Sequence, residues 1–212
     1  YPSQDADSPK VDTALYAKEN GQVIHALALT AMRLDRAESL ALAEAAAHAV
    51  LATHEQDGAF AHVQGGAPHL GDTVWMGRAF LALYQATSDS VWLDRSISAA
   101  RSLERFRNPD GPGYATALPD GPLAPTMQRD EHIALARWVN ALAHLVDDDD
   151  LHATAGQART WLFTPDIALA RRVAVGGILL TDREHTEAPL KVRVAGDGPI
   201  AEALHKAALQ HP

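Results

Sequence analysis

Acidic and histidine side chains stand near the starts of three expected helices in this chain of 212 residues. Carboxylates and imidazoles can move protons near neutral pH once their surroundings tune their pKa, so such groups suit general acid/base catalysis. If the three helix starts converge, two of these side chains could act as a catalytic pair. The candidate catalytic residues are Glu19, His25, Asp72, Asp130, Glu131 and His132.

A second set of side chains could bind the ligand, because sugar sites use aromatic walls together with polar groups. These candidates are Trp75, Arg78, Tyr114 and His62. Each set also has a structural explanation. Asp72 fits an N-cap for a helix over 73–87, acidic residues at 130 and 131 favour the dipole at a helix start, and Trp75 and His25 fit a helical core.

No local motif for a metal or a cofactor is present in the sequence. The chain has no cysteine, and its eleven histidines form neither HExxH nor a pair four residues apart on one expected helix. The DDDD block at 147–150 lacks the spacing of a calcium loop and is interpreted as a solvated break between helices. Gly196-x-Gly198-x-x-Ala201 has the glycine spacing of a dinucleotide-binding fingerprint, but the sequence around it does not provide the βαβ unit that the fingerprint requires. We therefore expect no metal site and no cofactor.

The charge of the chain argues against a nucleic-acid partner. The formal net charge is −9, and no cluster of Lys and Arg could follow a phosphate backbone. No apolar run reaches about 18 residues, so we expect no membrane-spanning segment. The absence of cysteine leaves the compartment undecided, with the cytoplasm slightly favoured. The opening YPSQDADSPK is interpreted as the start of a trimmed or excised piece.

Apolar periodicity predicts a mainly α protein made of antiparallel helix pairs. We expect a disordered lead-in over 1–14, a helical body over 15–182 and a strand–helix appendage over 183–212. Within the appendage, KVRVAG predicts a short strand and Pro199 the first turn of a helix. The expected helices span 20–34, 37–53, 73–87, 91–107, 130–145, 151–162, 166–181 and 199–209.

Two similar turns follow two of these helices, QDGAF at 56–60 and PDGPGY at 109–114. They lie about one helix pair apart, which indicates an internal repeat of helix hairpins. Gly58 and Gly111 are expected to be left-handed, with Phe60 and Tyr114 packing back onto the helices. If the hairpins repeat, the loops 56–66 and 108–127 emerge on the same side.

The order of five segments carries a resemblance. They are KENGQVIHALALTAMRL with its Asn20-Gly21, the helix and turn at 37–63, LGDTVWMGRAFLALYQATSDSVWLDRSISAARSL, APTMQRDEHIALARWVNALAHL and KVRVAGDGPIAEALHKAALQHP. In this order they resemble the C-terminal half of the spermatogenesis-associated thioredoxin-domain family. That half is an (α/α) toroid similar to six-hairpin glycosidases and N-acylglucosamine epimerases. The resemblance implies an incomplete (α/α) toroid here.

The chain departs from this family at several positions. Glu19 stands where the family has Trp, and Thr73-Val74 where it has Tyr-Ala. These departures favour a non-catalytic toroid scaffold or interaction domain related to the thioredoxin-domain proteins. The alternative is a carbohydrate-active domain, epimerase- or glycosidase-like, that binds a sugar in the toroid mouth. The scaffold would pair with a missing N-terminal half, a neighbouring domain or a second copy.

Overall fold

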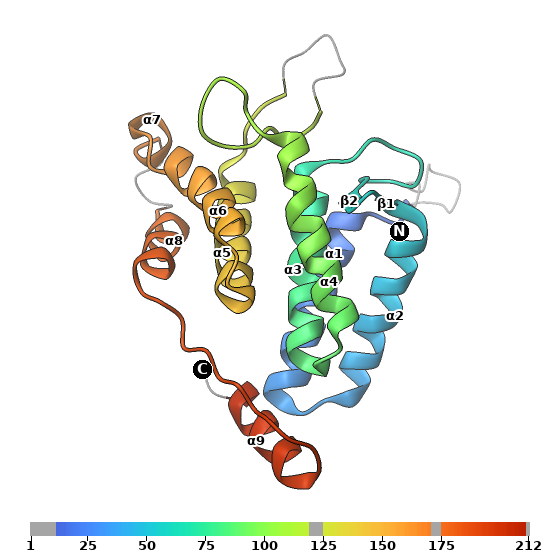
Figure 1. Cartoon of the computed structure of the whole chain (residues 1–212). Coiled ribbons are helices and arrows are strands. Elements are labelled where there is room, and N and C mark those ends of the chain that lie inside the picture. The colour runs from blue at the N-terminus through green and yellow to red at the C-terminus, as the bar shows by residue number, and fades with distance from the viewer. Residues whose placement is uncertain (1–11, 119–124, 171–174, 211–212) are drawn as a thin grey trace, which may run out of the picture.

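A computed structural model describes residues 12–118, 125–170 and 175–210 of the chain (Figure 1). Residues 1–11 of the expected lead-in over 1–14 lie outside these residues. Helices dominate, with one two-stranded antiparallel hairpin of β1 (Glu55–Gln56) and β2 (Ala59–Phe60). The helices are α1 (Ala17–Leu34), α2 (Ala37–His54), α3 (Leu70–Thr87), α4 (Ser90–Ser102) with the 3₁₀ turn η1 (Leu103–Phe106), α5 (Arg129–Val146), α6 (Asp149–Leu162), α7 (Pro165–Ala168), α8 (Gly176–Thr186) and α9 (Pro199–Gln210).

Three antiparallel helix pairs follow one another, α1 with α2, α3 with α4, and α5 with α6. The first helix of each pair packs against the first helix of the next, and α8 packs against α5, so α1, α3, α5 and α8 form an inner row. The long loops before α3 and before α5 meet at one end of this row (Figure 1), where the Leu70 N–H donates to the Thr116 carbonyl oxygen over 2.9 Å. The predicted helix pairs, with both loops on the same side, are confirmed.

Aspartates occupy the helix caps in two turns between paired helices. Asp35 and Asp147 end α1 and α5 in the left-handed conformation, with φ of 54° and 56°. Asp148 then caps α6 by accepting the N–H groups of Asp150 and Leu151, each over 3.0 Å. The DDDD block is therefore a helix break, as predicted, in which one aspartate ends a helix and the next begins another.

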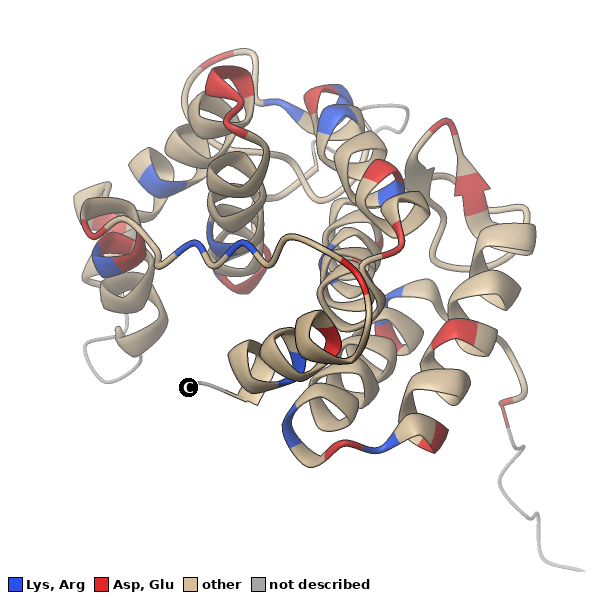
Figure 2. Cartoon of the chain, turned by 60° about the horizontal axis from the view of Figure 1, so that its bottom comes forward, with Lys and Arg blue, Asp and Glu red and all other residues tan. Residues whose placement is uncertain are grey.

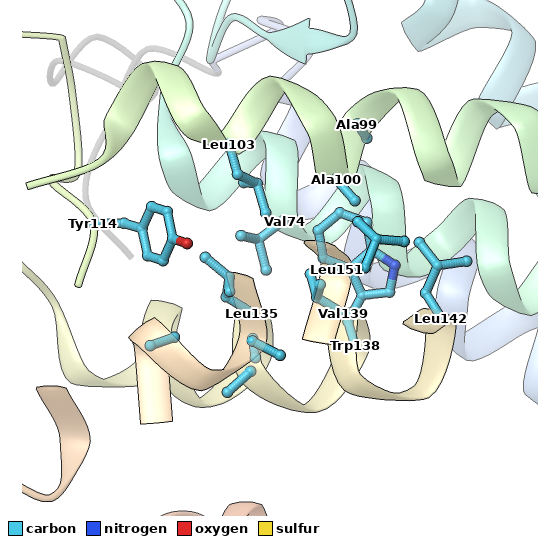
Figure 3. Close-up of a cluster of buried hydrophobic side chains, with 14 of the residues drawn as sticks. Val74, Ala99, Ala100, Leu103, Tyr114, Leu135, Trp138, Val139, Leu142 and Leu151 are labelled. Carbon is cyan, nitrogen blue, oxygen red and sulfur yellow. The ribbon is translucent and has the colours of Figure 1, made fainter. Parts of the chain in front are cut away.

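The largest apolar cluster joins the second helix pair to the third (Figure 3). Leu103 from η1 and Leu135, Val139 and Leu142 from α5 are fully buried in it. Trp138 enters the same cluster, and its indole N–H donates to the Ser96 hydroxyl over 3.0 Å. Burying such side chains contributes about 2 kcal/mol each, so this cluster fixes α5 against α3.

The turn at Asp57-Gly58 connects the two short strands. Both residues are left-handed, with φ of 52° and 82°, a pattern typical of two-residue hairpin turns. Phe60 and Tyr114 are both buried, as predicted. The prediction for Gly111 was wrong: in the second turn Gly113, with φ of 99°, is the left-handed residue. A longer loop moves the position that needs a positive φ.

Gly58→Val should lower the free energy of unfolding by about 1 kcal/mol or more. A β-branched residue resists the left-handed region, and a Cβ atom here would lie 2.7 Å from both oxygens of Ser98. Gly65 also has a positive φ, but nothing lies within 4 Å of a Cβ built there. Gly65→Val thus measures the backbone strain alone. Equal urea midpoints for Gly58→Val and the parent protein would contradict this account.

Two expected elements differ from the structure. The predicted helix over 166–181 is interrupted: α7 ends at Ala168, and α8 begins at Gly176. The prediction of a single helix was wrong, because the glycine pair 176–177 stands at the start of a separate helix and not inside a continuous one. Residues 171–174 lie outside the described part of the chain.

The appendage contains its predicted helix, α9, but KVRVAG is not a strand. A strand needs a partner backbone, and this segment instead passes the C-terminal ends of α3 and α5 on its way to α9 (Figure 2). There the Lys191 ammonium donates to the His144 carbonyl oxygen and to the Asp147 carboxylate over 3.2 and 3.0 Å. No helix in the described residues is long and apolar enough to cross a membrane.

Candidate functional site

Asp72 joins the starts of two inner helices. Its Oδ1 accepts the backbone N–H of Lys18 over 2.7 Å and lies 3.0 Å from the His62 Nδ1. The prediction that Asp72 caps its own helix was wrong, because α3 already begins at Leu70 with His69 as its N-cap residue. Asp72 instead satisfies a free N–H in the first turn of α1.

Glu131 brings the start of α5 to the same place. Its Oε2 accepts the Thr116 hydroxyl over 3.2 Å, and its Oε1 lies only 2.6 Å from where a Cβ would stand on Gly71, the residue before Asp72. Burial raises the pKa of Glu131, the nearby Lys18 opposes that rise, and the charge of Asp72 adds to it. The starts of α1, α3 and α5 therefore converge, with two buried carboxyl groups among them.

His132 faces away from this cluster and into the core. Its Nε2 accepts the backbone N–H of Tyr114 over 2.9 Å, which places the ring proton on Nδ1, 2.7 Å from the Gln128 carbonyl oxygen. Burial lowers the pKa of His132 to about 4. Tyr114 is buried as well and donates its hydroxyl to the Thr154 carbonyl oxygen. Both side chains therefore hold the loop before α5 in place.

The low pKa of His132 predicts acid-sensitive stability. The unfolded chain, with an ordinary histidine pKa of 6.5, takes up a proton that the folded chain rejects until about pH 4. The contribution of His132 to stability is thus present above pH 6.5 and is lost as the pH drops, by about 2 kcal/mol between pH 7 and pH 5. Urea unfolding of His132→Gln should show a smaller loss over this interval than the parent, with the exposed His48→Gln as control. The same loss in all three proteins would contradict the assignment.

The inner row also surrounds a cavity of about 610 Å³, a volume in the range of small-molecule sites. Side chains from α1, α3, α5 and α8 line it, together with the residues that follow α8. Its polar lining consists of His25, Arg78, Gln85, Arg137, Asn140, Arg183, Glu184 and Glu187.

Most charges in the cavity are paired. Arg137 donates from Nε and Nη2 to the two carboxylate oxygens of Glu184, each over 2.8 Å, a fork geometry that joins α5 to α8. Arg183 bonds Glu187 one turn further along, over 2.9 Å. Arg78 has no such partner among the described residues, and its guanidinium lies 4.8 Å from the centre of the Trp75 ring.

His25 lies beside these cations and is neutral. Burial lowers the pKa of His25 to about 4, and the charges of Arg78 and Arg137 contribute to this. Its ring meets the Trp75 ring edge to face at 6.3 Å. Neither ring nitrogen has a hydrogen-bond partner in the described part of the chain, so His25 can accept a proton or a hydrogen bond from a ligand in the cavity.

The structure thus separates the predicted site residues into groups. Asp72, Glu131 and His62 meet at the helix starts, whereas His25 and Arg78 line the cavity, with Trp75 in contact with both. Glu19 and Asp130 are exposed, and His132 and Tyr114 are buried. Sequence reasoning missed Lys18, Thr116, Arg137 and Glu184. Of these four, only Arg137 could have been found from the sequence, because a cation inside the apolar run of α5 indicates a buried polar site.

The described residues contain no group of three His, Asp or Glu side chains that could hold a metal ion. No family model matches the chain, and no curated protein matches it either.

Solved structures with the same fold do exist. A D-mannose isomerase is 14% identical with a TM-score of 0.58, and the match covers 70% of this chain and 44% of that one. A cellobiose 2-epimerase from Bacillus thermoamylovorans is 15% identical with a TM-score of 0.59, covering 72% and 45%. A family 76 α-mannanase from Bacteroides thetaiotaomicron is 13% identical with a TM-score of 0.67, covering 96% and 58%.

These neighbours confirm the predicted incomplete (α/α) toroid, of the kind found in sugar epimerases and glycosidases. At such identities the likeness shows the fold alone. The chain spans about half the length of these enzymes, between 44% and 58%. A relation to the thioredoxin-domain family is not shown by them.

Proposed function

We propose that this chain forms the sugar-binding wall of a carbohydrate-active toroid, and that His25 transfers a proton at the carbon next to a sugar carbonyl. The observation that carries the proposal is His25 itself: a neutral imidazole, with no hydrogen-bond partner among the described residues, lines a cavity of sugar size beside Arg78. General bases act best when they are deprotonated at the working pH and within reach of the substrate.

In this reaction the imidazole takes the proton from C2 of an open-chain aldose. The C2–H bond breaks, its electron pair forms the enediolate, and negative charge develops on the carbonyl oxygen. The net positive charge of the cavity lining would stabilise that oxygen. Return of the proton to the other face of C2 gives the epimer. Its delivery to C1, with the C2 hydroxyl proton moving to O1, gives the ketose.

The alternative chemistry, glycoside hydrolysis, needs two carboxyl groups beside the scissile bond. In the described residues both carboxylates of the cavity, Glu184 and Glu187, are engaged by arginines. This supports proton transfer over hydrolysis. An isomerase and an epimerase with the same fold are consistent with that choice.

The test is deuterium exchange. The chain is incubated in D₂O with D-mannose, D-glucose or cellobiose, and the C2 proton is followed by NMR. We expect the C2 signal of at least one sugar to disappear and an epimer or ketose to accumulate. If none of these sugars or their acidic derivatives binds, and none exchanges its C2 proton, the proposal is rejected.

A non-catalytic scaffold is the second candidate. It is favoured by Asp72 and Glu131, whose hydrogen bonds tie helix starts together and leave both carboxyl groups buried. In this role the half toroid would support a thioredoxin-like domain, another half toroid or a second copy. Light scattering that shows a stable dimer, together with no sugar binding, would favour this candidate.

A further inference from the structure

The cavity on the inner row carries an unbalanced positive charge. Arg137 is matched by Glu184 and Arg183 by Glu187. Arg78 lines the same cavity without a carboxylate at ion-pair distance in the described part of the chain. The surplus cation stands out because the chain as a whole has a net charge of −9.

Arg78 is also a costly residue to leave unmatched. Burial lowers the pKa of its guanidinium and the charge of Arg137 lowers it further, while the charge of Glu184 raises it in part. A guanidinium has five N–H donors, and no protein acceptor takes one from Arg78 among the described residues. The face of Trp75 offsets part of this cost, by about 1 kcal/mol. A partly buried cation with free donors is the arrangement that binds an anion well.

We propose that the ligand of this cavity is an anionic sugar, with its carboxylate or phosphate held by Arg78. This inference rests on the proposed function, since it names the class of sugar bound at the same site. Planar N–H pairs of a guanidinium match the oxygens of either anion in a two-pronged bond. Glu184 does not oppose the ligand strongly, because Arg137 already neutralises it.

Calorimetry at low salt tests this inference with three sugars of one configuration: D-mannose, D-mannuronate and D-mannose 6-phosphate. We expect at least one acidic sugar to bind tenfold or more tightly than mannose, and the preferred acid identifies carboxylate or phosphate as the anion. Arg78→Gln should bring the acidic sugar to the affinity of mannose, and Arg78→Lys should keep part of the difference. Arg95→Gln, an exposed cation on α4, should change nothing.

Three results would overturn the inference. If mannose binds as tightly as both acids, the cavity takes a neutral sugar, and the proposed function survives. If inorganic phosphate or acetate alone binds as tightly as the acidic sugars, Arg78 holds a simple anion and the sugar is irrelevant. If none of the three sugars binds, the inference fails, and the proposed function fails with it unless D-glucose or cellobiose binds. The comparison between sugars uses the parent protein, so it stands even if a variant unfolds.

Discussion

Gly77→Ala should destabilise the protein by about 3 kcal/mol. A Cβ atom on Gly77 would lie 2.0 Å from Cζ2 and 2.2 Å from Cη2 of Trp138, far inside contact distance. The indole cannot retreat freely, because its N–H donates to the Ser96 hydroxyl, which donates in turn to the Gly77 carbonyl oxygen over 2.9 Å. Admitting the methyl group therefore breaks both packing and hydrogen bonds where α3 meets α5.

Chemical denaturation measures the effect, and the chain offers a matched control. Gly156 lies inside α6 with nothing within 4 Å of a Cβ built there. Gly156→Ala should stabilise the protein by about 0.5–1 kcal/mol through helix propensity alone. Replacing Trp138 by Leu in the Gly77→Ala background should recover part of the loss. Similar midpoints for both alanine variants would show that α3 and α5 do not approach as described.

His25→Asn should lower the rate of deuterium exchange at C2 at least 100-fold, the usual contribution of a general base. Binding of the sugar should change much less, because Asn keeps a hydrogen-bonding group on α1. His48→Asn, on the exposed side of α2, is the control for a histidine outside the cavity. An exchange rate that falls only as far as binding does would make His25 a binding residue and not the base.

The pH dependence of exchange should identify the same group. A base works when deprotonated, so activity is present above its pKa and is lost as the pH falls through it, here near pH 4. Removing the charge of Arg78 relieves one cause of the low value. Arg78→Gln should therefore move the midpoint toward 6.5. An unchanged midpoint in this variant would assign the titration to another group.

The helix pairs were predictable because their signals are local. Apolar spacing located α1 to α6, and the DDDD block marked the turn between α5 and α6. Errors arose where a residue acts on a distant segment. Asp72 caps α1 from α3, and KVRVAG meets helix ends instead of a strand. Neither relation can be read from neighbouring residues.

The candidate site was predictable only in part for the same reason. His25 was singled out as an imidazole near a helix start and Arg78 as a polar group for a sugar site, but nothing in the sequence says that α1 and α3 turn them toward one cavity. The bond between Arg137 and Glu184 joins residues 47 positions apart and depends on α8 closing the row. His132 is the opposite case. It belongs to a dense polar cluster at a helix start, which suggested a catalytic role, but its side chain is part of the core.

The central claim, that the cavity of the inner row binds a sugar, is tested most directly by NMR of the indole N–H groups during a sugar titration. The chain has four tryptophans. Trp138 lines the cavity and Trp75 lies against His25 and Arg78, while Trp92 and Trp161 are buried in other clusters. The account predicts saturable shifts of the Trp75 and Trp138 signals, with Trp92 and Trp161 unchanged. A sugar that binds yet moves only Trp92 or Trp161, or a titration that moves none, would contradict it.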